Sequence, residues 1–120
     1  MKIKVLFLTM AISILLASAA YAHPPSDIKI TFDPETKILQ AIIYHSTSNP
    51  AQHYINKIDV ALNGKEIISQ EISREDNNLT QTASYLISDA KPGDVLSVEG
   101  YCSISGKLGK EITVRENANK

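Results

Sequence analysis

The chain has 120 residues, a formal net charge of −1 and one cysteine. A chain of this length is expected to form a single small domain, because it is too short to bury two independent hydrophobic cores. It contains no block of basic residues and no alternation of basic with aromatic residues, so the sequence predicts no nucleic-acid partner. One cysteine cannot form an internal disulfide, so the domain must be stabilised by its apolar core or by a bound metal ion.

The first 22 residues have the pattern of an export signal. Lys2 and Lys4 form a basic start, a mostly apolar run follows, and a small-x-small cleavage motif ends at Ala22. The apolar run is shorter than the ~20 residues that a membrane span requires, and no later stretch is long enough. The sequence therefore predicts a cleaved signal peptide over residues 1–22.

Cleavage after Ala22 is expected to release a domain of residues 23–120 into the periplasm or outside the cell, without membrane association. The alternative is an uncleaved signal that tethers the domain. Without Lys2 and Lys4, ten basic residues remain against 13 acidic ones, so the formal net charge of the mature chain is −3.

Short β-strands separated by turn residues are expected throughout the mature chain. The expected strands cover residues 28–32, 37–44, 53–62, 65–72, 80–87, 94–104 and 110–115. No segment after the signal has the periodicity of a helix. About seven strands bounded by turns predict an all-β fold, an immunoglobulin-like antiparallel β-sandwich.

The strand over residues 53–62 and the turn after it have local features of their own. The inward-facing parity changes between Ile55 and Ile58, which predicts a β-bulge between these residues. The dipeptide Asn63-Gly64 is the strongest hairpin signal in the chain, because both residues tolerate the positive φ of a tight turn.

The strand that contains the cysteine has the most regular alternation. Every second residue of this segment is small or apolar: Leu96, Val98, Gly100, Cys102 and Ile104. This period-2 pattern predicts a half-buried strand with the Cys102 thiol on its inner face and Tyr101 pointing away from it, followed by a turn at Gly106. The charged residues Arg74-Glu75-Asp76 and Glu99 are expected to lie on the solvated surface.

Four residues of the mature chain are candidate metal ligands: His23, His45, His53 and Cys102. Each lies in a loop or near the end of an expected strand. Imidazole and thiolate are common ligands of iron, copper and zinc. If the four side chains meet at one end of the sandwich, we expect them to bind one metal ion. The alternative for Cys102 is a buried free thiol that only packs in the core. No serine elbow or phosphate-binding glycine loop is present.

Three short motifs resemble segments of superoxide reductases, the iron proteins known as neelaredoxins and desulfoferrodoxins. Residues 53–60, HYINKIDV, are similar to the family's H-Y-I-x-W-I-E-L, and residues 101–106, YCSISG, resemble its Y-C-N-x-H-G. His23-Pro24-Pro25 falls where the family has H-V-P, and His45 precedes His53 much as another family histidine does. The resemblance spans nearly the whole mature chain in order.

This resemblance implies a seven-stranded sandwich that holds one non-haem iron through histidines in a plane and an axial cysteine thiolate. It implies Cys102 as the axial ligand, with His23, His45 and His53 as equatorial ligands and no further catalytic residue. The implied activity is the reduction of superoxide to peroxide by the ferrous ion, at the open position opposite the thiolate. Superoxide and an electron-donor protein are the implied partners.

The chain departs from the family pattern at three places. Ser105 stands where the family has its fourth histidine, and serine is a poor substitute for a neutral imidazole at iron. His45 and His53 are eight residues apart, whereas the family usually has six. No lysine precedes His23 in the mature chain, and its net charge is negative, so attraction of superoxide is not evident.

Two alternatives follow from these departures. If His23 is the first mature residue, its α-amino group and its imidazole can chelate Cu²⁺ together, which predicts a periplasmic copper-binding carrier. If the absence of a histidine at Ser105 abolishes the site, the domain is a non-catalytic interaction module that retains the fold.

Overall fold

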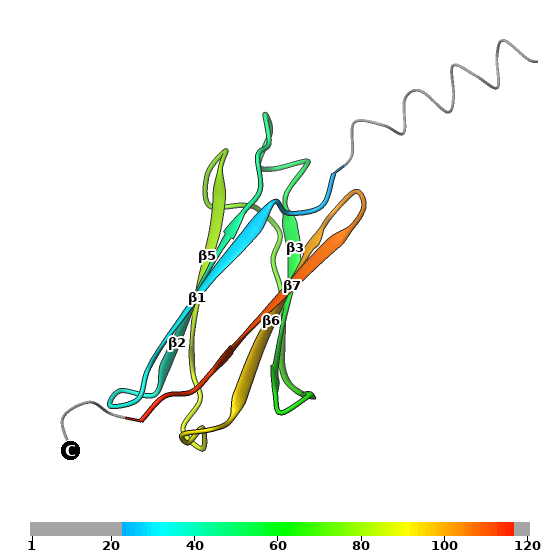
Figure 1. The fold of residues 1–120 in the computed structure, drawn as a ribbon. Coiled ribbons are helices and arrows are strands. Elements are labelled where there is room, and N and C mark those ends of the chain that lie inside the picture. Colours follow the sequence, from blue (N-terminus) through cyan, green and yellow to red (C-terminus); the bar gives the residue numbers. More distant parts are fainter. Residues whose placement is uncertain (1–22, 117–120) are drawn as a thin grey trace, which may run out of the picture.

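The computed structural model of the chain describes residues 23–116, which form two antiparallel β-sheets packed face to face (Figure 1). The strands are β1 (Asp27–Asp33), β2 (Ile38–Tyr44), β3 (Ile55–Leu62), β4 (Lys65–Glu71), β5 (Thr80–Leu86), β6 (Val95–Cys102) and β7 (Lys107–Thr113). No helix occurs in the described residues. The expected all-β sandwich of seven strands is therefore confirmed.

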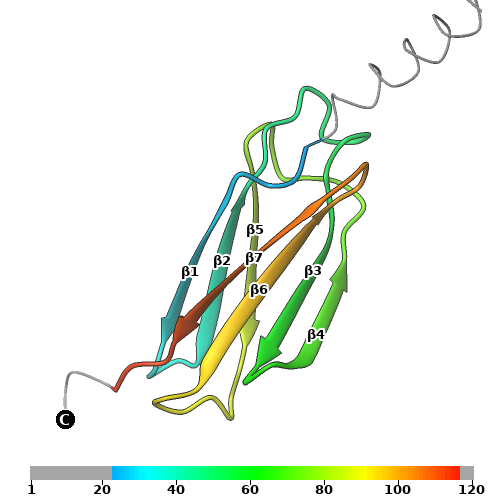
Figure 2. The ribbon, with the colours of Figure 1, turned by 45° about the vertical axis from the view of Figure 1, so that its right-hand side comes forward.

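The strand order is that of an immunoglobulin-like sandwich with three strands in one sheet and four in the other. The first sheet has the order β1-β2-β5, and the second has the order β4-β3-β6-β7. Strand β4 pairs with its hairpin partner β3 and so joins the second sheet (Figure 2). The outer strands β1 and β7 lie side by side, and an ion pair of 2.6 Å between Asp27 and Lys110 connects them.

The core consists of alternate side chains from both sheets, as expected for a sandwich. Its fully buried members include Leu39, Ala41, Ile43, Ile55, Ile58, Val60, Leu96 and Val98. In β6 every second residue up to Cys102 is buried, so the expected inward position of the thiol is confirmed. The two sheets approach closely at Gly100, where a Cβ atom would lie 3.0 Å from Cδ1 of Ile43.

The predicted hairpin and bulge at β3 are both confirmed. Asn63 and Gly64 have φ angles of 50° and 82°, the positive values that a two-residue type I′ hairpin requires. The register between β3 and β6 shifts between Ile55 and Lys57, which is the expected bulge. The bulge allows both Ile55 and Ile58 to point into the core.

Two expected boundaries near the cysteine were wrong. Strand β6 ends at Cys102, and β7 begins at Lys107 instead of Lys110. Gly106 has a φ angle of 84°, a left-handed conformation that reverses the chain at this point. Ile104 consequently lies in the turn, with 57% of its surface exposed, and does not continue the inward face of β6.

The expected signal peptide, residues 1–22, lies outside the described residues. Between residues 23 and 116, no helix is long and apolar enough to cross a membrane.

Candidate metal centre

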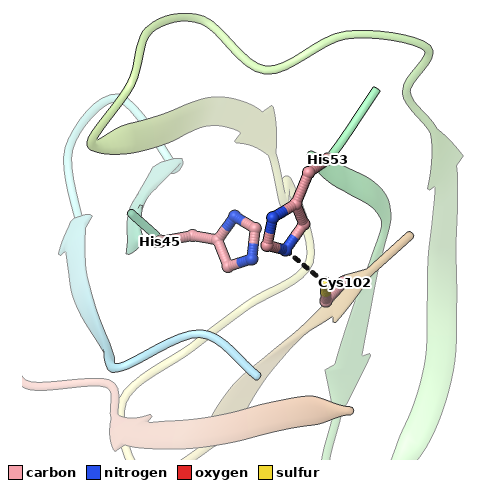
Figure 3. Close-up of side chains that lie close together, drawn as sticks. All are labelled: His45, His53 and Cys102. Carbon is pink, nitrogen blue, oxygen red and sulfur yellow. Dashed lines mark hydrogen bonds between the residues drawn. The ribbon is translucent and has the colours of Figure 1, made fainter. Parts of the chain in front are cut away.

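The four residues expected to bind a metal lie together at one end of the sandwich. His45 directly follows β2, His53 lies in the loop just before β3, and Cys102 is the last residue of β6. Because Ile55 at the start of β3 pairs with Cys102, the β3–β6 ladder brings His53 next to the thiol. Figure 3 shows the rings of His45 and His53 beside each other, with the Cys102 sulfur close to the His53 ring.

The separations within this cluster are short. The ring centres of His45 and His53 are 4.7 Å apart, and Nε2 of His53 lies 3.2 Å from Sγ of Cys102. One ligand atom each from His45, His53 and Cys102 lies within 4.8 Å of the others. Metal–ligand bonds of about 2.0–2.3 Å place two ligands of one ion at most about 4.6 Å apart. The three groups therefore need only a small movement to bind the same ion.

His23 lies at the periphery of the cluster. The centre of its ring is 5.3 Å from that of His45 and 5.4 Å from that of His53, and its side chain is exposed. It is not one of the three residues whose ligand atoms lie within 4.8 Å of one another. The structure thus brings all four expected residues together, with three in a compact group and His23 beside them.

In His45 and His23, a hydrogen bond occupies Nδ1 and leaves Nε2 free. Nδ1 of His45 lies 2.7 Å from Oε1 of Glu75, and Nδ1 of His23 lies 3.2 Å from the carbonyl oxygen of Pro24. A carbonyl or carboxylate oxygen can only accept, so each Nδ1 carries a proton and donates it. In the neutral ring, Nε2 then offers its lone pair to a metal ion.

The free nitrogen of His45 is the atom that most directly suggests a ligand. Its Nε2 is buried and has no hydrogen-bond partner among the described residues, and the His45 side chain is 0% exposed. A buried polar atom without a partner costs roughly 1–3 kcal/mol, and coordination of a metal ion satisfies it. The nitrogen and sulfur donors present here suit iron, copper or zinc.

The electrostatics of His53 also favour ligand binding. Burial lowers the pKa of His53 below its ordinary value, and the nearby His45 and His23 lower it further. A lower pKa favours the neutral imidazole, which is the form that coordinates metals.

Backbone hydrogen bonds fix the position of Cys102. Its N–H donates to the carbonyl oxygen of Gly106 at 3.0 Å, and the N–H of Ser103 donates to the carbonyl oxygen of Tyr54 at 2.8 Å. Ser103 Oγ in turn accepts a hydrogen bond from the Tyr54 N–H at 3.1 Å. Cys102 is 7% exposed and forms no disulfide, so its thiol is held as a free group beside His53.

The position of His23 depends on a close contact between two distant segments. The segment before β1 runs toward the β6–β7 turn (Figures 1 and 2), where Pro24 packs on Gly106. A Cβ atom at Gly106 would lie 2.8 Å from Cβ of Pro24, a distance that requires one of the two segments to move. The absence of a side chain at Gly106 therefore allows the segment to lie where His23 reaches the cluster.

Glu75 belongs to this site although the sequence predicted it on the surface. Glu99 does lie on the outer face of its sheet, where it pairs with Lys107 at 2.6 Å, but Glu75 is only 1% exposed. The expectation was wrong for Glu75 because its carboxylate turns inward to bind the buried ring of His45. Nothing in its local sequence distinguishes it from the exposed Asp76 that follows it.

Ser105, which stands where the superoxide reductase motif has a histidine, is exposed in the β6–β7 turn. The fold and the cluster together define an immunoglobulin-like β-sandwich with histidine and cysteine side chains gathered at one end. No protein-family model matches the chain, and no curated protein matches it. The resemblance to superoxide reductases therefore depends on the three motifs alone.

Proposed function

We propose that this protein is an exported metal protein that binds one non-haem iron ion and acts in the manner of superoxide reductases. The observation that carries the proposal is the convergence of His45, His53 and Cys102, whose ligand atoms lie within 4.8 Å of one another. With His23 beside them, these are all the histidines and the only cysteine of the chain. Core packing alone does not require all three histidines and the cysteine to lie at one end of the sandwich.

The ligands have different roles in this proposal. Cys102 supplies a thiolate that donates electron density to the metal, while His45, His53 and His23 supply neutral nitrogen donors. When bound, ferrous iron supplies the one electron that, with two protons, converts superoxide to hydrogen peroxide, and a donor protein returns the electron. His23 is exposed and His53 is part-buried, so these two ligands lie on the solvent side of the cluster.

Metal content tests this proposal. Protein recovered from the periplasm is expected to contain stoichiometric iron and, when oxidised, to show a sulfur-to-iron charge-transfer band. Cys102→Ser is expected to remove the band and to lower iron affinity by more than ~100-fold, because changes outside the ligand shell alone cost 10–100-fold. The exposed neighbour Ser105→Ala is the matched control and should change neither. Absence of iron from the wild type, or unchanged iron in Cys102→Ser, contradicts the proposal.

A copper-binding carrier is the second candidate, and the location of His23 favours it. If cleavage makes His23 the first residue, its α-amino group lies on the same residue as an imidazole that borders the cluster. Adding one alanine before His23 is then expected to abolish tight Cu²⁺ binding, as measured by competition with a chelator of known affinity. Unchanged Cu²⁺ affinity in the extended protein excludes the carrier.

A non-catalytic interaction module is the third candidate. Ligand positions more than ~10 Å apart would favour it, because direct metal–ligand bonds are about 2.0–2.3 Å long. The separations of 4.7–5.4 Å between the histidine rings favour a binding site instead.

A further inference from the structure

We propose that Glu75 is a positioning residue of this site, which fixes the tautomer of His45 and strengthens the binding of divalent metal ions more than that of monovalent ones. The inference rests on the proposed metal site and adds to it a residue that belongs to none of the three motifs. Glu75 acts through His45, because its carboxylate is not part of the compact group of ligand atoms.

The environment of Glu75 is unusual for a carboxylate. Its side chain is 0% exposed, and Oε1 accepts hydrogen bonds from Nδ1 of His45 at 2.7 Å and from the N–H of Ile55 at 3.2 Å. Oε2 is buried and has no hydrogen-bond partner among the described residues. A buried ion pair such as Glu75–His45 contributes little to the stability of a fold. A role in the metal site is therefore a better explanation for a carboxylate at this buried position.

The backbone around Glu75 holds the pair in place. The N–H of Glu75 donates to the carbonyl oxygen of Pro50 at 3.1 Å, in the loop between His45 and His53. The N–H of His45 donates to the carbonyl oxygen of Leu79, in the same β4–β5 connection that carries Glu75, at 2.9 Å. The connection therefore fixes both members of the pair, which gives His45 one orientation before a metal binds.

This geometry is the outer-shell arrangement common in metal proteins, in which a carboxylate binds the far nitrogen of a histidine ligand. Glu75 keeps the proton of His45 on Nδ1 and directs the lone pair of Nε2 toward His53 and Cys102. The Glu75 carboxylate and a Cys102 thiolate also place two negative charges in or beside the site. A divalent ion balances both charges, whereas a monovalent ion such as Cu⁺ or Ag⁺ leaves one uncompensated in a buried environment.

Glu75→Gln tests the contribution of the charge, because it retains the shape of the side chain and removes its charge. Co²⁺ affinity is expected to fall by about 10–100-fold and Ag⁺ affinity by clearly less, as measured by competition titration. In the metal-free Glu75→Leu variant, which has no acceptor for the Nδ1–H, ¹⁵N NMR of the His45 ring is expected to show loss of the single Nδ1–H tautomer. Glu99→Gln, which removes a charge from the outer face of the sheet, is the matched control and should change none of these.

The outcomes separate this inference from the proposed function. Failure of the wild type to bind Co²⁺ contradicts the metal site itself, while the tautomer measurement on the metal-free protein still tests Glu75. Wild-type Co²⁺ affinity in Glu75→Gln, or an unchanged tautomer in Glu75→Leu, overturns the inference, and equal losses for Co²⁺ and Ag⁺ overturn its charge selectivity. If Glu75→Gln does not fold, Glu75→Asp keeps the charge but shortens the side chain, and wild-type Co²⁺ affinity in that variant overturns the positioning role.

Discussion

Replacing His45 with leucine is expected to lower the free energy of unfolding of the metal-free protein by about 3 kcal/mol or more. Leucine fills a similar volume but cannot donate to Glu75, whose carboxylate would remain buried without its side-chain partner. Chemical denaturation of the wild type and His45→Leu measures the difference. His53→Leu is a useful comparison, because His53 is less buried and its loss leaves no buried carboxylate unpaired.

The double variant shows whether the cost comes from the unpaired carboxylate. Replacing His45 and Glu75 together by leucine is expected to restore much of the lost stability, because apolar residues often replace a buried ionic pair without loss. Denaturation of the two single variants and the double variant gives the coupling energy. A loss within about 0.5 kcal/mol for His45→Leu, as for an ordinary surface substitution, contradicts the buried pair.

Gly106→Ala is expected to have the second large effect, on both stability and the position of His23. The φ angle of 84° disfavours any L side chain by roughly 1–2 kcal/mol, and the new Cβ would also lie 2.8 Å from Cβ of Pro24. Displacement of Pro24 moves His23 away from the cluster. Nuclear Overhauser contacts between the His23 and His53 rings should therefore disappear in the metal-free variant.

Gly93→Ala separates the two causes of that effect. Gly93 has a similar φ angle of 91°, but a Cβ atom there would meet no atom within 4 Å. Its replacement is expected to cost the backbone strain alone, roughly 1–2 kcal/mol, and to leave His23 beside His53. Equal losses of stability in the two variants, together with unchanged ring contacts in Gly106→Ala, would show that the contact with Pro24 does not place His23.

Most of the fold could be predicted because its determinants are local in the sequence. Alternating apolar residues predict the strands, and Asn63-Gly64 predicts a hairpin whose positive φ angles the structure contains. The end of β6 and the start of β7 were misplaced because the alternation of β6 extends to Ile104, beyond the end of pairing at Cys102. Gly106, where a turn was expected, has the left-handed conformation that reverses the chain.

The candidate site was predictable only in part. The residue type identifies candidate metal ligands, but it does not identify the residues that orient those ligands. His45, His53 and Cys102 were expected from their chemistry, and the pairing of β3 with β6 accounts for the meeting of the last two. Glu75 was missed because its burial results from long-range packing of the β4–β5 connection against the loop at Pro50. A single charged residue in a polar segment gives no sign of such a contact.

X-ray absorption spectroscopy at the iron edge of the purified protein tests the proposed iron site most directly. We expect stoichiometric iron with one sulfur scatterer, from Cys102, together with several nitrogen scatterers from the histidine rings. Loss of the sulfur scatterer in Cys102→Ser would assign it to that residue. Protein without iron, or iron surrounded only by oxygen and nitrogen in the wild type, would contradict the proposed iron site.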